Sequence, residues 1–369
     1  MFVLKSIATL LALAASVSAH RSAQAIHRRH HRMHAHSQRT CSSHIATSAS
    51  NSAESASPTA NNDEIRTTSS VHSASSTHSS AAAIQTSDTL SFHTDLAALA
   101  PIANILETWS TAPSAPEPLP LSDSTFRITN DLTALPHPYV PAPDGQLSVK
   151  ATYPQGSWNF QNSPQGGFSF YAPGPSDVDL TTAKEVTLGY SVFFEDGFEF
   201  NLGGKLPGLY GGDSDEIALS CSGGKRDNRC FSARLMWRTN GAGEMYTYLP
   251  PAYDANDAVC NVAPFSTCND EYGASVGRGS YTFEAGQSTA ISMRVRLNDA
   301  GQQNGELQLW ANGQSVVNVG GLVLRDSDAG RIRGLMMQTF FGGSTQNYAS
   351  PKDQSTYFRD FTIAITEKL

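Results

Sequence analysis

The chain has 369 residues, a net charge of −8 and 16% charged residues. No apolar run reaches the ~20 residues that span a bilayer, which argues against a membrane protein, and the acidic balance argues against nucleic acid as a partner. All 11 histidines lie within the first 137 residues, so chemistry in the rest of the chain cannot use a Ser-His-Asp or Cys-His arrangement.

Residues 1–19 have the features of a secretory signal peptide. Lys5 gives a positive start, an apolar stretch runs from Ile7 to Val17, and Val17-Ser18-Ala19 fits a cleavage site. The apolar stretch is too short for the alternative, a membrane anchor. We therefore expect a secreted, extracellular protein.

Residues 20–125 are predicted to form a disordered tail. Residues 20–45 are rich in His and Arg, which indicates a solvated basic tail, with metal binding as the alternative. Ser, Thr and Ala dominate residues 46–90, which cannot bury enough apolar surface to fold. Residues 94–110 have apolar residues at helical spacing, interrupted by Pro101, and predict a short docking helix.

Residues 126–369 are predicted to form one all-β domain. Apolar and polar residues alternate along 186–194, 291–298 and 357–365, and Asn312-Gly313 is typical of a hairpin turn. Many short strands with glycine-rich turns favour a β-sandwich of the jelly-roll, concanavalin-like kind. We expect this domain to be a monomer.

Four cysteines lie in this domain, and an even number in a secreted chain predicts two disulfides. Of the three connectivities, we favour Cys221–Cys230 and Cys260–Cys268, because each closes a short loop. Zinc is the alternative, although neither pair has the usual C-x2-4-C spacing. Cys41 is left over in the tail, either free or intermolecular.

Two predicted strands offer the basic patch that an anionic ligand needs on an acidic domain. Alternation puts Ser232 and Arg234 on one face of the first strand, and Tyr246 and Tyr248 on one face of the second. An odd-length loop centred on Asn240, with a left-handed glycine, brings all four onto one face. A two-residue loop splits them between faces. We expect the odd loop; the alternative is that these are ordinary strand residues.

A third element is the segment 198–205. Alternation places Glu199, Asn201 and Lys205 on one face, opposite three apolar side chains. Glycines crowd residues 203–212, and glycine permits close approach of a backbone or a ligand. We expect Glu199, Asn201 and Trp237 to bind substrate. The alternative for Lys205 is an exposed loop lysine.

The segment 203–212, followed by Ser232-x-Arg234 and Tyr246-x-Tyr248, resembles polysaccharide lyase family 14, which includes alginate lyases and lyases acting on polyglucuronate. The resemblance covers roughly 150–369 and implies a β-jelly roll. It implies functional roles for Lys205 and for the four residues of the two motifs. It also implies an enzyme that cleaves an acidic polysaccharide by β-elimination, leaving a 4,5-unsaturated uronate end.

β-Elimination sets three tasks that these residue types fit. Arg234 can neutralise the uronate carboxylate, because guanidinium is always charged and grips a carboxylate at two points. Lys205 is the expected base or proton shuttle, and Tyr246 or Tyr248 the acid, although these roles could be exchanged. The charges of Lys205 and Arg234 should lower the tyrosine pKa values, and Arg234 should lower that of Lys205. An alkaline activity optimum follows.

This scheme requires no metal and no cofactor, because the arginine replaces a calcium ion. A cluster of acidic residues could bind a cation, but a solvated acidic loop is the favoured interpretation of Asp213, Asp215 and Glu216.

Two other classes of function are open. A non-catalytic lectin-like module would hold an acidic glycan with Lys205 and Arg234 and would use tryptophans as sugar platforms, namely Trp158, Trp237 and Trp310. A glycoside hydrolase would need two carboxylates ~5 Å apart, and the acidic residues of 195–199 do not alternate correctly for this. Loss of turnover, rather than weaker binding, after substitution of Lys205 or Tyr246 distinguishes the enzyme from the lectin.

Overall fold

The computed structural model describes residues 96–369. The predicted signal peptide, the His- and Arg-rich tail, the Ser-, Thr- and Ala-rich segment and Cys41 lie outside the described residues. No helix within residues 96–369 is long and apolar enough to cross a membrane.

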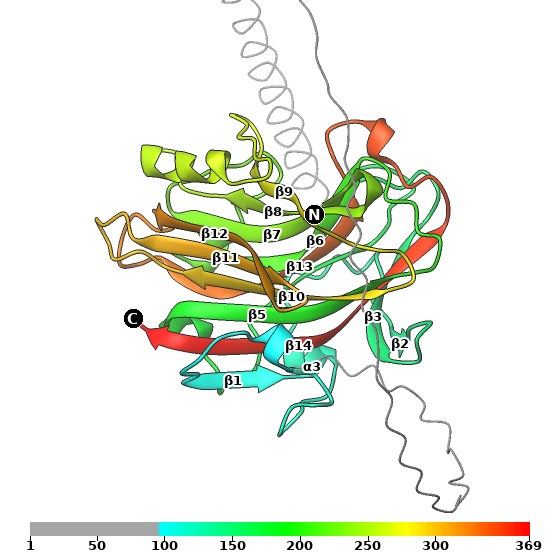
Figure 1. Cartoon of the computed structure of the whole chain (residues 1–369), viewed down its shortest axis with the longest axis horizontal. Helices are drawn as coiled ribbons and strands as arrows, with labels where there is room; N and C mark the ends of the chain where they lie inside the picture. Colours follow the sequence, from blue (N-terminus) through cyan, green and yellow to red (C-terminus); the bar gives the residue numbers. More distant parts are fainter. Residues whose placement is uncertain (1–95) are drawn as a thin grey trace, which may run out of the picture. The chain divides into compact units, whose positions relative to one another are not determined.

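The described chain consists mostly of strands (Figure 1). The strands are β1 (Glu107–Ser110), β2 (Tyr139–Pro141), β3 (Leu147–Tyr153), β4 (Phe168–Ala172), β5 (Ala183–Phe194), β6 (Gly203–Gly212), β7 (Cys230–Arg238), β8 (Ala242–Tyr248), β9 (Ala274–Thr282), β10 (Ser288–Arg296), β11 (Gly305–Ala311), β12 (Gln314–Leu322), β13 (Arg331–Phe341) and β14 (Gln354–Lys368). The helical segments are α2 (Leu96–Leu99), α3 (Asp123–Phe126), α4 (Asp215–Ala218), η1 (Leu180–Thr182), η2 (Thr239–Gly241), η3 (Asp254–Asn261) and η4 (Gln346–Tyr348).

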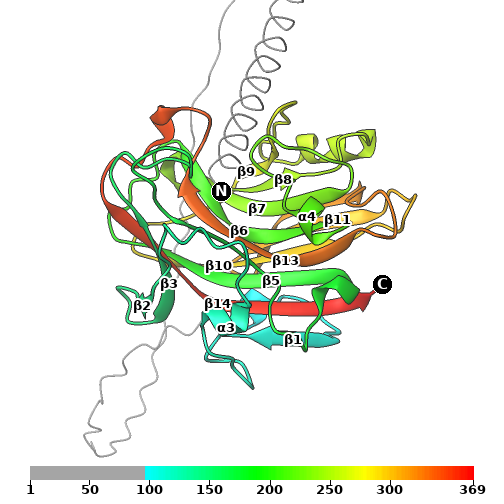
Figure 2. The ribbon, with the colours of Figure 1, turned by 180° about the vertical axis from the view of Figure 1, so that it is seen from behind.

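These strands form two antiparallel sheets that pack face to face, which confirms the predicted sandwich (Figures 1 and 2). The larger sheet has the order β12-β11-β10-β5-β14-β3-β2, with β1 also paired to β14. The smaller sheet has the order β4-β13-β6-β7-β8-β9. Its five strands from β13 to β9 carry the candidate functional residues.

The core lies between the sheets and follows from the alternating pattern. On β5, Val186, Leu188, Tyr190 and Val192 are fully buried. The facing strands of the smaller sheet contribute their own inward set to the same cluster, namely Leu206, Leu209, Ala233, Leu235 and Trp237. Since successive side chains point to opposite faces, the residues between these inward ones face away from the core.

The start of the domain differs from the prediction. The expected helix over 94–110 is a single turn, α2, followed by the strand β1, which pairs with β14 at residues 362–365. β3 pairs with β14 only at 354–358, so β1 fills the next part of the same edge. Trp109 is buried against Phe126. Backbone pairing along a free strand edge outweighs the helical spacing, and the folded part begins before residue 126.

The register of the β7–β8 hairpin confirms the odd-loop prediction. Arg234 lies opposite Tyr246, and Ser232 opposite Tyr248. The connection η2 has Asn240 in the left-handed region (φ 59°, ψ 27°) and Gly241 at φ 75°. Left-handed residues at these two positions allow the chain to reverse with an odd loop.

Both predicted disulfides are present. Cys221–Cys230 closes a loop between α4 and β7, with a sequence separation of 9. Cys260–Cys268 joins η3 to the segment before β9, with a separation of 8. The two bridges therefore fix the two loops that flank β7 and β8 in the sequence.

Candidate active site

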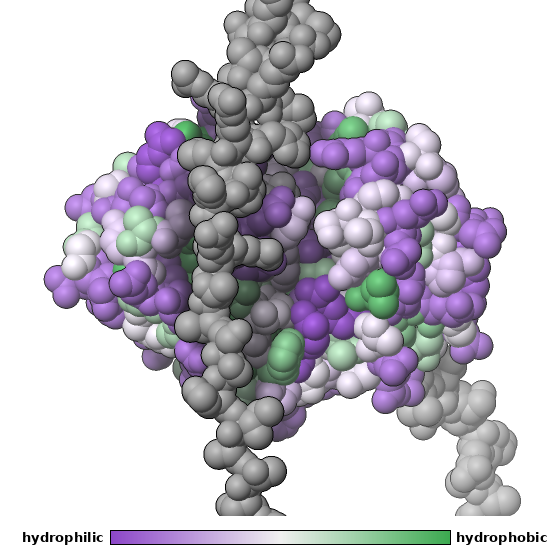
Figure 3. Space-filling model, turned by 90° about the horizontal axis from the view of Figure 1, so that it is seen from above, coloured by the Kyte–Doolittle hydropathy of each residue, from purple (hydrophilic) through white to green (hydrophobic). Residues whose placement is uncertain are grey.

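The outward face of the smaller sheet is hollowed into a groove of about 710 Å³. Its floor includes Lys205 on β6, Arg234 on β7, Tyr246 on β8 and Gln338 on β13. Its walls come from loops, with residues 158–162 and 342–348 in one set and residues 222–223 and 267–273 in the other. Figure 3 looks onto the side of the molecule that carries this face. Most of the surface that the grey atoms leave visible there is hydrophilic. We call this cavity the groove.

Lys205 lies in the floor of the groove, not in an exposed loop. Its Nζ is 3.6 Å from the centroid of the Tyr246 ring and 2.7 Å from the Met236 sulfur. Among the described residues, no carboxylate pairs with this amine. Burial, followed by the positive charges of Arg234 and Arg238, holds the pKa of Lys205 well below its ordinary value of 10.5. This shift favours the neutral, basic form of the amine.

Arg234 is 2% exposed, yet it lines the groove. Its Nη1 donates to the Gln338 side-chain oxygen at 2.9 Å, and Gln338 in turn donates to Ser169 at 3.1 Å. The Arg234 Nε is buried and has no hydrogen-bond partner among the described residues. A buried donor without a partner is costly. Because Arg234 also lines the groove, its guanidinium can bind an anionic group there.

Tyr246 and Tyr248 lie side by side on β8, with ring centroids 5.9 Å apart. The backbone N–H of Gly224 donates to the Tyr248 hydroxyl oxygen at 3.0 Å. The pKa of Tyr246 is raised above 10, first by burial and then by Tyr248, although Arg234 lowers it. This corrects the expected lowering: desolvation of the phenolate outweighs the neighbouring positive charge.

Ser232 does not line the groove, which argues against the predicted catalytic role. Its side chain is fully buried, and its hydroxyl donates to the Cys221 carbonyl at 2.7 Å. The strand face was predicted correctly, but the loop closed by Cys221–Cys230 covers this end of the face. Ser232 therefore holds the disulfide loop in place.

The three predicted substrate-binding residues do not line the groove. Trp237 is 0% exposed and faces the core, where its indole N–H donates to the Phe200 carbonyl. Glu199 is exposed and forms an ion pair with Lys352, and Asn201 donates to two carbonyls of the loop at 347–349. Neither lines the groove. Alternation does not extend through this segment, because Asn201 is left-handed (φ 47°) and β6 begins only at residue 203.

The glycines of β6 serve backbone packing. A Cβ on Gly208 would collide with the backbone of β7 at Ala233 and Arg234, and one on Gly204 would collide with the Trp237 ring. The close approach that the sequence indicated is therefore between strands, next to a register shift at 206–208.

A charged network at the groove was not predicted from the sequence. Glu244 on β8 is fully buried and pairs with Arg238 and Arg278, both of which line the groove. Of the three tryptophans named as possible sugar platforms, Trp158 lines the groove from the loop before β4, whereas Trp237 and Trp310 do not. Glu244 follows the same alternation as Tyr246, so the strand pattern alone could have placed it on this face.

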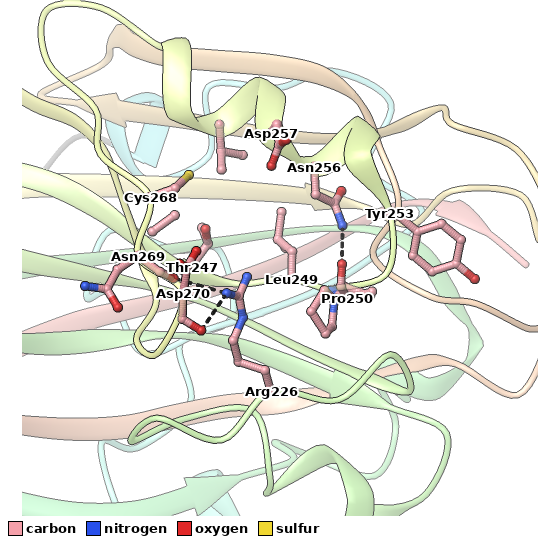
Figure 4. A pocket seen from close by; sticks show the side chains of 13 residues that line it. Arg226, Thr247, Leu249, Pro250, Tyr253, Asn256, Asp257, Cys268, Asn269 and Asp270 are labelled. Carbon is pink, nitrogen blue, oxygen red and sulfur yellow. Dashed lines mark hydrogen bonds between the residues drawn. The ribbon is translucent and has the colours of Figure 1, made fainter. Parts of the chain in front are cut away.

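A second, smaller cavity of about 170 Å³ lies beneath η3 (Figure 4). Thr247 lines it from β8, on the opposite strand face from Tyr246 and Tyr248. Arg226 donates to the Asn269 and Asp270 carbonyls at its edge and so joins the two disulfide loops. This cavity shares none of the groove's basic residues.

Asp213 lies outside the groove. Burial and the charge of Asp326 raise its pKa. Within residues 96–369, no group of three or more His, Cys, Asp or Glu residues could hold a metal ion.

Comparisons with known proteins place this geometry in context. The family model described as Polysaccharide lyase 14 matches residues 142–361. The crystal structure of the marine PL-14 alginate lyase from Aplysia kurodai is 31% identical, with a TM-score of 0.60 over 71% of this chain and 100% of that chain. The alginate lyase vAL-1 from Chlorella virus is 24% identical, with a TM-score of 0.55 over 66% of this chain and 93% of that chain, and supports the fold. No curated protein sequence matches the chain.

Proposed function

The chain belongs to the polysaccharide lyase 14 family, and we propose from this premise that it cleaves a polyuronate, alginate first among the candidates, by β-elimination. The family match and the 31% identity to an alginate lyase support this substrate class. The observation that carries the proposal is local: a buried arginine with an unpartnered Nε lies beside an amine stacked on a tyrosine ring.

The first step concerns the substrate carboxylate. A C5 proton becomes acidic enough to remove only when the adjacent carboxylate is neutralised. The Arg234 guanidinium supplies this charge, and the Gln338 bond at 2.9 Å fixes its orientation. Because the groove floor is buried, the resulting ion pair is stronger than it would be in water.

Proton transfer follows with Lys205 as base and Tyr246 as acid. The neutral Lys205 amine takes the C5 proton, the C4–O bond breaks as the C4–C5 double bond forms, and a phenol proton passes to the departing O4 oxygen. The lowered pKa of Lys205 favours the neutral amine, and the raised pKa of Tyr246 favours the neutral phenol. Tyr248 borders the same space and is the other candidate acid.

We also propose that the protein is secreted and acts as a monomer without a cofactor. The two disulfides support an oxidising compartment, as does the predicted signal peptide at residues 1–19. Every side chain that the elimination uses comes from one chain.

The test is ultraviolet absorbance during incubation with polymannuronate, polyguluronate and polyglucuronate. Elimination conjugates a new double bond with the carboxyl group, which absorbs, whereas hydrolysis does not. We expect absorbance to rise with at least one polymer for the wild type and to stay flat for Lys205→Ala. Sugar binding without any rise, at neutral and alkaline pH, would instead support the lectin-like module.

A further inference from the structure

We propose that Arg238 and Arg278, held by the buried Glu244, form a second carboxylate-binding subsite in the groove, which takes another uronate of the same polymer chain. The inference rests on the proposed function and deepens it. It predicts a preference for polymers in which successive sugars are charged over polymers with isolated uronates.

The geometry centres on Glu244, whose side chain is fully buried in β8. One carboxylate oxygen accepts from Arg238 Nε at 2.9 Å and from Nη2 at 2.6 Å. The other accepts from Arg278 Nε at 2.7 Å and from the Ser275 hydroxyl at 2.5 Å. Both oxygens are therefore fully used, and three neighbouring strands, β7, β8 and β9, are joined in one network.

The charges of this network do not cancel. One carboxylate faces two guanidinium groups, so a positive charge is left over. Both arginines line the groove, with side-chain exposures of 14% and 32%. No described residue accepts from the Nη1 of either arginine. The groove therefore holds both an uncompensated positive charge and N–H donors that have no partner among the described residues.

The larger sheet carries a second network of charged side chains, and its charge balance is the opposite. There, three basic groups pair with four carboxylates, so the acidic groups are in excess: Arg294, Arg296 and Lys184 against Glu185, Glu306, Glu367 and Asp299. A buried carboxylate costs free energy unless it is paired, and one arginine would be enough to pair Glu244. The second arginine is explained by a ligand that brings its own negative charge.

The position of the network fits another charged sugar of the same polymer chain. Arg238 and Arg234 lie four residues apart on the same face of β7, about 13 Å along the strand. Arginine side chains that reach into the groove from both positions can contact carboxylates on different sugars of one chain. Arg278 lies 5.2 Å from the Phe265 ring, which limits the freedom of its guanidinium.

The first experiment compares Arg278→Gln and Arg238→Gln with the wild type on the polyuronate that the enzyme cleaves. Loss of a charge-assisted hydrogen bond should raise KM about tenfold or more in both variants. For Arg278→Gln we expect a much smaller fall in kcat. Arg238→Gln also removes a positive charge that lowers the pKa of Lys205, so its kcat should fall as well at neutral pH. Arg294→Gln is the matched control: it removes the same charge from a strand arginine paired with two carboxylates, and we expect no change in KM.

The second experiment measures binding without turnover. In the Lys205→Ala protein, calorimetry with a uronate tetrasaccharide should show about tenfold weaker binding when Arg278→Gln is added. Arg278 is partly exposed, so this variant should fold even if Arg238→Gln does not. Unchanged KM and unchanged affinity in Arg278→Gln would overturn the subsite. A wild type inactive on every polymer, with the affinity loss still present, would overturn only the proposed function.

Discussion

Burial acts on Lys205 and Tyr246 in opposite directions and so separates a base from an acid. Removing water disfavours the charged form of each group, which is the ammonium of the lysine and the phenolate of the tyrosine. The pKa of Lys205 therefore falls and that of Tyr246 rises. One physical cause thus favours the neutral amine of Lys205 and the neutral phenol of Tyr246.

The first prediction concerns the pH dependence of kcat/KM. Lys205 must be neutral to act as base, so the rate should rise with pH through its lowered pKa. Tyr246 must be protonated, and its raised pKa keeps it so beyond pH 10. We expect an alkaline optimum in the absorbance assay. A rate that peaks near pH 5 and is lost by pH 8 would contradict these roles.

Two variants sharpen this prediction. Lys205→Ala should lower kcat by about 10²- to 10⁴-fold, which is the usual contribution of a positioned acid or base. Tyr246→Phe should lower kcat similarly if Tyr246 is the acid, and Tyr248→Phe should then lower it less. The reverse order would assign the acid to Tyr248.

The second prediction concerns Ser232. Ser232→Ala leaves the buried Cys221 carbonyl without its donor, so the free energy of unfolding should fall by about 1–3 kcal/mol. Because Ser232 does not line the groove, kcat should stay near the wild-type value. Urea denaturation and the absorbance assay test the two halves. An unchanged stability together with a hundredfold loss of kcat would show that Ser232 takes part in the reaction.

At the scale of elements, the loop between α4 and β7 supports the tyrosines. The Cys221–Cys230 disulfide packs in one apolar cluster with Met236, Tyr246 and Tyr248. Gly224 of the same loop donates to the Tyr248 hydroxyl. The disulfide therefore acts on the groove and on stability together.

The third prediction separates these two effects with two double variants. Cys221→Ser with Cys230→Ser should lower the free energy of unfolding by about 3 kcal/mol, the chain-entropy value for so short a loop, and should also lower kcat. Cys260→Ser with Cys268→Ser opens a loop of similar length, with a separation of 8 against 9. It should cost similar stability with a smaller loss of kcat. Equal losses of kcat would contradict a specific supporting role for the first loop.

At the scale of the whole described fold, the sandwich extends to α2 and β1. Trp109 is 4% exposed and packs edge-on against Phe126, with ring centroids 6.3 Å apart. Leu99 is also fully buried. Residues of α2 and β1, which were predicted to belong to the disordered tail, therefore contribute to the folded domain.

The fourth prediction is that Trp109→Ala lowers the free energy of unfolding by about 3–5 kcal/mol, through lost burial and a residual cavity. Trp109→Phe keeps most of the contact and should cost less. Urea denaturation followed by circular dichroism measures both. A wild-type stability for Trp109→Ala would show that the domain begins near residue 126, as the composition suggested.

The charge of the whole chain also differs from the charge of its groove. The chain carries −8, yet the groove is lined by Lys205, Arg234, Arg238 and Arg278, with Glu244 buried beneath. A net charge describes the average surface and not the field in a cleft. An acidic protein can therefore bind a polyanion.

The sequence by itself determined the all-β sandwich, the two disulfides and the pairing of Arg234 with Tyr246. Each depends on local information: the two-residue period of a strand, the length of a loop between cysteines, and turn residues such as Asn240 and Gly241 that accept a left-handed backbone. Such rules hold without knowledge of distant contacts.

Only the tertiary structure decided which residues of the outward face reach the groove. Ser232 shares that face but is covered by the disulfide loop, and Trp237 belongs to the core side. The role of Glu244 is visible only in the structure, where Arg238 and Arg278 pair with it from the two neighbouring strands. The sign of the Tyr246 shift depended on its burial. Coverage by loops, pairing across strands and desolvation arise from residues far apart in sequence, so no local pattern encodes them.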